Sequence, residues 1–320
     1  MDSATKDTPD AMAGPEPRST SHPDTAEGWR ARLDALGEDL GYHERLGPRH
    51  HALFVDDGPV LLVAFDTIDS ARAQGPDQMP QGFALARAEG WSYLGMIADG
   101  ETWWRDPAVW GYIDRLVDDA FFEDFDRVVF FGADMGGYAA AAFSVAAPGA
   151  TVVTLRPQAT LDPRLSEWDN RFTRARRLDF TSRYGFAPDM VEGAEAVFLL
   201  YDPDRTQDAM HAALFARPHV TRLRCRHMGG RLESELARMG ILDPLLRLAC
   251  EGKLDAAAFH GLFRARRHHL PYLLRLLQRL SNRQRHGLTA RLARWALERQ
   301  DHPRLRAMKE NAERQQSADA

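Results

Sequence analysis

The chain has 320 residues, 44% of them hydrophobic, which is long enough for one large domain with appendages or for two domains and excludes a largely disordered protein. Its two cysteines are too few for a disulfide framework or a thiolate zinc site, so we expect a protein of the reducing cytoplasm, with no metal or cofactor. No apolar run reaches the length of a membrane span, and the first residues lack the apolar core of a signal peptide.

The net charge of −5 is unevenly distributed along the chain. Residues 240–320 contain 16 Lys and Arg against 8 Asp and Glu, which leaves 25 against 38 for the rest. We therefore expect an acidic globular body over residues 28–240 and a basic helical extension over residues 241–320. Residues 1–27, rich in Asp, Pro, Ser and Thr, are predicted to form a disordered tail.

Apolar spacing predicts alternating helices and strands through the body. Trp29, Leu33, Leu36 and Leu40 are spaced three or four apart and predict a helical entry over residues 29–46. The predicted strands that follow cover residues 51–56, 60–66, 91–98, 128–131, 151–155, 196–201 and 220–225. The predicted helices between them cover residues 83–88, 107–120, 138–147 and 206–215.

This alternation predicts an α/β fold with a mainly parallel sheet flanked by helices. Residues 158–194 contain no convincing strand, and from Ile241 onward leucine stripes predict helices only. In such a sheet, functional side chains are expected at the carboxyl ends of the strands.

The most informative stretch is the segment from Asp126 to Gly149. A strand buried on both faces is followed by Gly132-Ala133-Asp134-Met135-Gly136 and then by an alanine-rich helix. A strand, a sharp turn and a tightly packed helix form the context in which G-x-S-x-G becomes a nucleophile elbow. Here the position of the nucleophile is taken by Asp134.

Three residues fall at strand ends in the chain order nucleophile, acid, histidine: Asp134, Asp202 and His227. This order and context resemble the α/β-hydrolase superfamily over roughly residues 50–240. The resemblance implies that Asp134 attacks an sp³ carbon to form an ester, as in proteins similar to haloalkane dehalogenases and epoxide hydrolases. His227, oriented by Asp202, would then activate the water that hydrolyses the ester, with Asp162 as the alternative acid.

The resemblance also implies an oxyanion hole. One donor would be the N–H of Met135, which follows the nucleophile, and the other would come from the loop containing Thr67 and Ile68. The pattern departs from the family in three places. The tryptophan that usually follows a dehalogenase aspartate is replaced by Met135, the expected cap offers only Tyr184 as a tyrosine, and an HGGG-type motif is missing.

An alternative interpretation of Asp134 is structural. A strand–glycine–helix corner can keep its geometry after the nucleophile is lost, and the aspartate would then only cap the helix N-terminus. Likewise, His227 could be an ordinary loop histidine. Gly132 to Gly137 could also suggest a phosphate cradle, but neither dinucleotide nor Walker-type spacing is present to favour it.

Residues 158–194 occupy the place of a cap in hydrolases of this type and carry five clustered arginines. Among them, Arg174 and Arg177 lead to the hypothesis of an electropositive lid that favours an anionic substrate. The alternative is a solvated face that forms salt bridges to the acidic body. The basic helical extension could dock on that body or on a partner protein, while nucleic acid is not expected because no recognised motif is present.

Several segments also look like a group of bacterial proteins of about this length that are often labelled phosphoadenosine phosphosulfate reductase; they include GADMGGYAAAAFSVAAPGA and LYDPDRTQDAMHAALFARPHVT. The reductases of that name share a phosphate loop and an E-C-G-x-H cysteine, and Cys225 and Cys250 lack those neighbours. The motifs therefore do not support the label. Two expectations follow: a hydrolase acting through an ester on Asp134, or a hydrolase-like protein that binds a ligand or partner without turnover.

Overall fold

The computed structural model describes residues 25–74 and 76–318. The tail predicted for residues 1–27 lies outside the described residues, except that its end belongs to helix α1 (Ala26–Leu40). Thr25 caps this helix by accepting a hydrogen bond from the Gly28 N–H.

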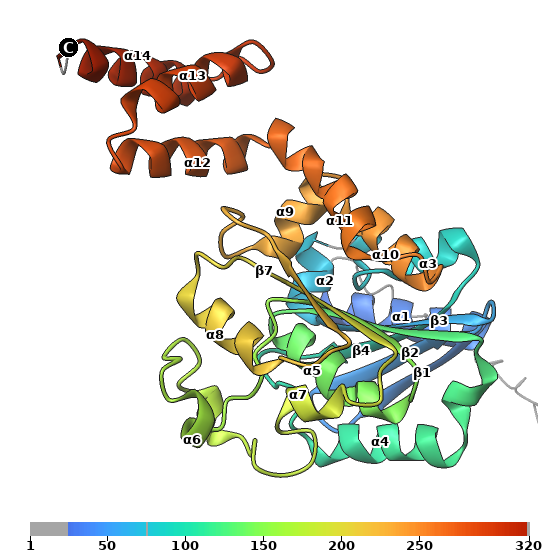
Figure 1. Ribbon diagram of the computed structural model, residues 1–320. Helices are drawn as coiled ribbons and strands as arrows, with labels where there is room; N and C mark the ends of the chain where they lie inside the picture. Colours follow the sequence, from blue (N-terminus) through green and yellow to red (C-terminus); the bar gives the residue numbers. More distant parts are fainter. Residues whose placement is uncertain (1–24, 75, 319–320) are drawn as a thin grey trace, which may run out of the picture.

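An eight-stranded sheet forms the centre of the molecule (Figure 1), in the spatial order β1-β2-β4-β3-β5-β6-β7-β8. The pairs β1–β2 and β2–β4 are antiparallel, and all other pairs are parallel. The strands are β1 (Gly41–Leu46), β2 (His50–Val55), β3 (Val60–Thr67), β4 (Ser92–Ala98), β5 (Arg127–Ala133), β6 (Thr151–Leu155), β7 (Ala196–Tyr201) and β8 (Val220–Arg224). The α/β architecture expected from the sequence, a mainly parallel sheet flanked by helices with helices alone at the C-terminal end of the described chain, is confirmed.

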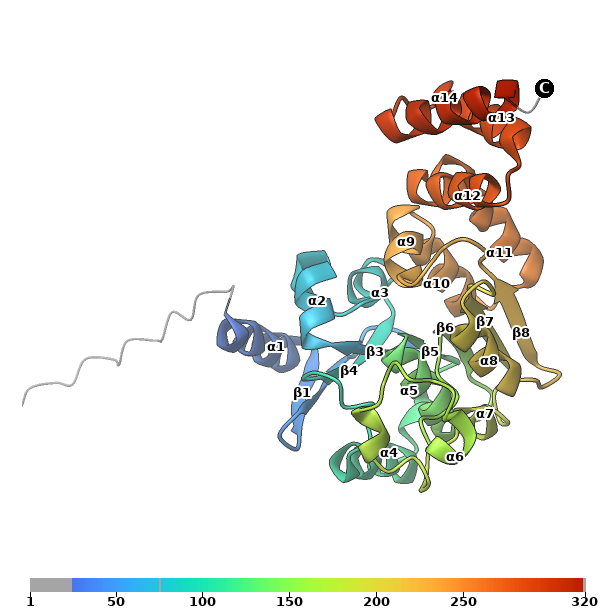
Figure 2. The same ribbon diagram turned by 90° about the vertical axis from the view of Figure 1, so that its left-hand side faces the viewer.

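Helices cover both faces of this sheet (Figures 1 and 2). One apolar core lies between the sheet and the helices α4 (Pro107–Asp118), α5 (Met135–Phe143), α7 (Ala187–Met190) and α8 (Thr206–Leu214). The second core, on the other face, lies under α1, α2 (Ile68–Gln74), α3 (Phe83–Glu89), α9 (Leu232–Arg238), α10 (Leu242–Cys250) and α11 (Ala256–Leu262). Alternation along β2 places Leu53 and Val55 in one core and Ala52 and Phe54 in the other.

The predicted entry helix over residues 29–46 is too long. Helix α1 ends at Leu40, where the apolar stripe also ends, and residues 41–46 form the edge strand β1 instead. The backbone of Gly41 pairs with Val55, and a Cβ at Gly41 would lie 2.4 Å from the Phe54 carbonyl oxygen. The close approach of a second strand, which apolar spacing along one helix does not reveal, stops the helix here.

Residues 158–194 contain only short helical segments, α6 (Pro163–Ser166), α7 and one 3₁₀ turn (Ala175–Arg177), in agreement with the absence of a predicted strand. They pack against α5, where Phe180 and Tyr184 join the first core. The guanidinium group of Arg105 holds this segment by donating to the carbonyl oxygens of Asp179 and Arg183, each at 2.7 Å.

The last three helices, α12 (Leu270–Asn282), α13 (His286–Leu297) and α14 (Pro303–Ala318), form an arm that stands away from the sheet (Figures 1 and 2). They enclose a small core of their own, which contains Leu273, Leu277, Ala293, Ala296 and Leu305. The arm meets the rest of the molecule near α9 and the loop after β8.

Candidate functional site

Asp134 stands at a sharp corner between β5 and α5. Its backbone has φ 54° and ψ −117°, a conformation that L-residues rarely adopt, and this turn projects the side chain above the sheet edge. The corner depends on two glycines: a Cβ at Gly132 would lie 2.1 Å from the Gly136 carbonyl oxygen, and one at Gly136 would lie 2.3 Å from that of Phe65. The sequence thus builds the geometry of an elbow around an aspartate.

The Asp134 carboxylate does not cap α5, because it accepts no hydrogen bond from the first turn of that helix. It is held by Arg156 instead: the guanidinium Nε lies 2.8 Å from Oδ1, and Nη2 donates to the same oxygen. Arg156 directly follows β6 and is itself in the positive-φ region, at 51°. Its side chain is 10% exposed, whereas that of Asp134 is 48% exposed.

Arg156 was missed by the sequence prediction, although the signal was available. In the parallel pair β5–β6, Ala133 lies opposite Leu155, so the next residue of each strand emerges at the same sheet edge. A charged residue directly after a buried strand, beside the elbow, is a candidate partner for the elbow residue.

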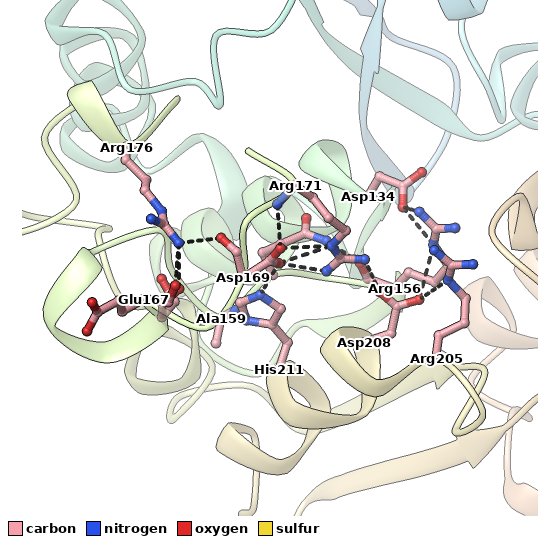
Figure 3. A network of polar contacts seen from close by, with 12 residues as sticks. Asp134, Arg156, Ala159, Glu167, Asp169, Arg171, Arg176, Arg205, Asp208 and His211 are labelled. Atoms are coloured by element: carbon pink, nitrogen blue, oxygen red, sulfur yellow. Dashed lines mark hydrogen bonds and ion pairs between the residues drawn. The ribbon is translucent and has the colours of Figure 1, made fainter. Parts of the chain in front are cut away.

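Arg156 is one member of a buried ionic network (Figure 3). The wholly buried Asp208 pairs with Arg171 and lies 3.3 Å from the Arg205 Nε and 3.8 Å from the Arg156 Nε. The network continues to Asp169, which pairs with both Arg171 and His211. A chain of alternating charges therefore links the elbow to residues 158–194.

His211, which lies in α8, has a defined tautomer in this network. Its Nδ1 accepts a hydrogen bond from the Ala159 N–H at 3.1 Å, so its Nε2 carries the proton and donates to Asp169 at 2.9 Å. Burial lowers the pKa of His211, although the Asp169 carboxylate opposes that shift. The neutral imidazole is a fixed structural group.

A cavity of about 730 Å³ opens beside Asp134. Its wall is formed by the ends of β3 and β5, the start of α5, the loop after β8 and helix α9. The lining residues are Phe65, Asp66, Thr67, Ser70, Gln81, Trp104, Ala133, Asp134, Met135, Gly136, Gly230, Arg231, Glu233, Ser234, Ala237 and Arg238. No residue of 158–194 lines it, so α9 forms the wall that the sequence interpretation had assigned to those residues.

The two expected oxyanion donors differ in their surroundings. Thr67 lines the cavity, but its N–H donates to Asp66 Oδ1 at 2.8 Å, while the Gln81 N–H donates to the other oxygen at 3.1 Å. Ile68 is the first residue of α2 and has a buried side chain. Met135 lines the cavity, and its Sδ accepts from the Trp103 N–H at 3.2 Å. The carboxylate of Asp66 thus occupies the donor that the loop would contribute.

The expected acid does not contact the expected histidine. Asp202, 2% exposed, accepts hydrogen bonds from the N–H groups of Asp204 and Gly229. It is Asp204 whose Oδ2 lies 2.8 Å from His227 Nδ1. The carboxylate of Asp202 therefore stabilises the turn after β7 instead of orienting the His227 imidazole. The type and order of residues in the sequence cannot distinguish these two roles.

Asp162, the alternative acid, caps α6 and pairs with Arg164, away from His227. Among the described residues, no hydrogen bond or ion pair joins His227 to Asp134, and His227 does not line the cavity. The arm holds the histidine instead, because Arg279 shares Asp204 Oδ2 with it at 2.8 Å and Arg275 donates to its carbonyl oxygen at 3.3 Å. Burial lowers the pKa of His227, against the opposing effect of Asp204.

Arg156 lies between the elbow and residues 225–231, the loop after β8 that contains His227. A Cβ at Gly230 would lie 3.3 Å from both the Arg156 and the Arg205 guanidinium groups, so these two side chains fill the space beside that loop. Arg174 and Arg177 are exposed on a short 3₁₀ turn and do not line the cavity. The structure thus gathers Asp134, Met135 and Thr67, and leaves His227, Asp202, Ile68 and the two lid arginines outside the cavity wall.

Glu233, on α9, is a cavity residue that the sequence analysis did not single out. Burial raises its pKa to about 8, and the neighbouring carboxylates of Asp66 and Asp134 contribute in the same direction. Burial also raises the pKa of Asp134, against the opposing effect of Arg156. Within residues 25–74 and 76–318, no group of three His, Cys, Asp or Glu side chains could hold a metal ion.

No model of a protein family matches the chain, and no curated protein matches it. Among solved structures, it is similar to the Gap123 glycosylation-associated complex of Streptococcus agalactiae, with 17% identity over 62% of this chain and 44% of that one, at a TM-score of 0.42.

Two further structures resemble the chain. The capsule O-acetyltransferase of Neisseria meningitidis serogroup A is 12% identical over 67% of this chain and 99% of that one, at a TM-score of 0.42. The esterase domain of a Rhodothermus marinus protein is 16% identical over 64% and 94%, at 0.39. Likenesses this distant carry no conclusion about activity. In the part of the chain that the structure describes, no helix combines the length and apolarity needed to cross a membrane.

Proposed function

We propose that this protein is a ligand-binding member of the α/β-hydrolase type, in which the cavity at the elbow holds a small polar molecule without hydrolysing it. The observation that carries the proposal is the ion pair between Asp134 and Arg156. A nucleophilic carboxylate needs a nearby base for the second step, in which water attacks the ester. The guanidinium group contacts only Oδ1 of Asp134; it cannot act as that base, and it stabilises the carboxylate in its resting, charged state.

Two further contacts support a site without turnover. The Thr67 N–H, one of the two expected oxyanion donors, is occupied by Asp66. His227 pairs with Asp204, which also receives Arg279 from the arm. A histidine held in this way has no hydrogen-bonded path to an ester on Asp134 among the described residues.

A second candidate function is hydrolysis through an ester intermediate on Asp134. It is favoured by the strained backbone of Asp134 and by the 48% exposure of its side chain, which lines the cavity. The oxygen that does not face Arg156 would attack an sp³ carbon, and the leaving group would depart with the bonding electrons. Water, deprotonated by His227 after the loop moves, would then attack the ester carbonyl and release the alcohol.

The reductase label finds no support in the thiols. Cys225 and Cys250 are 0% and 2% exposed, and burial raises the pKa of both, that of Cys250 to about 12. A thiol that takes part in reduction must be accessible and readily ionised. Two free buried cysteines are in keeping with the reducing, cytoplasmic setting proposed from the composition.

The two functions differ in the fate of the Asp134 carboxylate. We expect that incubation in H₂¹⁸O with a panel of esters, epoxides and haloacids leaves Asp134 unlabelled, as judged by peptide mass spectrometry. Hydrolysis of an aspartyl ester would place one ¹⁸O atom in that carboxylate, and a His227→Ala variant would accumulate the covalent adduct. Either signal, lost in Asp134→Asn, would establish the hydrolase and overturn the binding proposal.

A further inference from the structure

The arm formed by α12, α13 and α14 carries an excess of positive charge at its surface. Residues 270–318 contain 11 Arg and Lys against 4 Asp and Glu. The ion pairs with the body use Arg275 and Arg279. Arg285 and Arg291, in contrast, are exposed and form no ion pair within the described residues. The arm therefore keeps a positive surface that the acidic groups of its own chain do not neutralise.

Helix α13 also presents an apolar stripe that the arm covers only in part. Leu288, Leu292 and Trp295 are spaced four and three residues apart, so they share one face of the helix. Leu288 is 44% exposed, and the other two side chains are partly buried. Arginines border the stripe, because Arg291 follows Leu288 by three residues and Arg299 lies 4.1 Å from the centre of the Trp295 ring. Spaced apolar anchors of this kind are typical of a helix that binds in a groove of another protein.

A hollow of about 480 Å³, called the α4 groove below, lies beside α4 at the sheet edge where β5 and β6 begin. Its lining includes apolar side chains, Val117, Phe122 and Phe125, and exposed acidic ones, Glu123, Asp126 and Glu195. Val117 is 47% exposed. One cation, Arg127, also lines the groove, and a Cβ at Gly252 would lie 2.6 Å from its guanidinium group. The α4 groove is thus partly apolar and is bordered mainly by negative charge.

The negative charge around the α4 groove extends along the neighbouring chain. Residues 117–126 contain five Asp and Glu and no Arg or Lys. Within the described residues, none of these five carboxylates forms an ion pair. The pairs of Arg115 with Glu44 and of Arg183 with Asp114 involve other acids. A partner that brings cations to this surface would relieve the repulsion among these carboxylates.

The arm and the α4 groove lie at opposite ends of the molecule (Figures 1 and 2). In both views the arm is at the top and α4 is at the bottom, with the sheet between them. The arm of one chain therefore does not reach the α4 groove of the same chain. The two surfaces can meet only between different copies of the protein.

We propose that α13 of one copy docks into the α4 groove of a second copy, so that the protein associates head to tail. The apolar stripe of α13 enters the groove, and Arg285 and Arg291 face its acidic border. Every molecule carries both surfaces, which differ from each other, so the interface is heterologous and each copy can bind two neighbours. This association goes beyond the proposed function, since neither surface includes the elbow cavity.

Sedimentation velocity of the full chain over a concentration series tests the association. In about 0.1 M salt, the average mass should rise with protein concentration, through dimers to longer assemblies. Raising the salt to about 1 M shortens the screening length to about 3 Å and should weaken the association roughly tenfold. A wild-type protein that stays monomeric at every concentration in low salt overturns the inference.

Two charge-reversed variants identify the surfaces. Arg285→Glu/Arg291→Glu changes the sign of the arm surface, and Glu123→Arg/Asp126→Arg changes the sign of the groove border. Each variant alone should be monomeric, because its arm and its groove then carry the same charge. An equimolar mixture of the two should associate, since the arm of each variant meets a groove of opposite charge in the other. Recovery in the mixture also shows that both variants are folded.

Arg174→Glu/Arg177→Glu is the matched control. It reverses two exposed arginines outside both surfaces and should associate like the wild type. Association of either charge-reversed variant at the wild-type level, or no association in their mixture, contradicts the proposed interface. A monomeric protein whose arm binds a labelled RNA or polyglutamate instead would assign the arm to a different partner and overturn the inference.

Discussion

The pair formed by Asp134 and Arg156 determines what the elbow can do. Arg156 is buried and lies near two carboxylates, Asp134 and the wholly buried Asp208. Replacing Arg156 by Met removes the positive charge that both carboxylates face. Asp208 would then be a buried negative charge with one cation fewer beside it, so the variant should lose more free energy of unfolding than the intact ion pair contributes.

We expect Arg156→Met to lower the free energy of unfolding by roughly 1 to 3 kcal/mol, less than for a fully enclosed pair because Asp134 is half exposed. Urea denaturation of the two single variants and of Asp134→Asn/Arg156→Met measures the coupling. The double variant should recover part of the loss caused by Arg156→Met. Strictly additive effects would show that the two side chains do not interact in solution.

Glu233 predicts a pH dependence of stability. Its pKa is about 8 in the folded protein and 4.5 as the ordinary value, so the folded state binds the proton more tightly than the unfolded state. The stabilisation is complete below pH 4.5 and is lost as the pH rises to about 8. Burial raises the pKa of Asp66 and of Asp134 as well. Comparison of the wild type with a Glu233→Gln variant isolates the contribution of Glu233, because both proteins keep the two aspartates.

Denaturation of the wild type and Glu233→Gln across that pH range checks this prediction. The stability of the wild type relative to the variant should fall by roughly 4 kcal/mol between pH 4.5 and 8 and level off about one pH unit higher. A constant difference would mean that Glu233 titrates normally and faces solvent.

The residue scale also shows what the sequence could predict. Asp134 was found because G-x-D-x-G sits between a buried strand and an alanine-rich helix, both of which are local features. Arg156, Asp204 and Glu233 were missed. The backbone of the turn after β7 decides whether Asp202 or Asp204 contacts His227, and the spacing of residues in the sequence does not reveal that backbone conformation.

At the scale of elements, α9 joins the cavity to the arm. One face of this helix lines the cavity with Glu233, Ser234 and Ala237. From its other face, Glu235, with a 4% exposed side chain, pairs with His269 and with Arg275 of α12, the latter at 2.9 Å. A seven-residue helix has little stability of its own, so these contacts hold the cavity wall in place.

Arg275→Met should therefore loosen α9. We expect the backbone amides of residues 232–238 to exchange hydrogen about tenfold faster, since a loss of roughly 1.4 kcal/mol from local stability corresponds to that factor. Amides of α4, on the far face of the sheet, report global unfolding and should not change. Arg294→Met, which breaks a pair with Glu313 inside the arm, is the matched control and should leave α9 as it is.

The elements themselves were largely predictable, because strands β3 to β7 are mainly apolar runs and several buried helices carry clear stripes. The strand β1 was not, since it is an edge strand with only its last residue buried, and an adjacent helix masks it. Residues 158–194 were correctly predicted to lack strands, but their position could not be, because it depends on Arg105 and on the aromatic contacts with α5.

At the scale of the whole molecule, the charge asymmetry in the sequence takes a physical form. The basic arm is attached to the acidic body by arginine contacts at the loop after β8 and at α9: Arg279 with Asp204, and Arg275 with Glu235. The basic helices were expected to dock on the acidic body or on a partner protein. Arg279 meets the body at Asp204, which also pairs with His227, the residue expected from the sequence to be catalytic.

Both thiols are buried, which argues against a reductase. The same burial makes the protein suitable for labelling at a single introduced cysteine. Cys225 and Cys250 lie inside the second core and ionise reluctantly, so thiol reagents should leave the folded chain untouched. A single cysteine placed at Leu288, an exposed residue of α13, would then be the sole reactive position. A fluorophore attached there could report movement of the arm relative to the cavity without removing a native residue from either core.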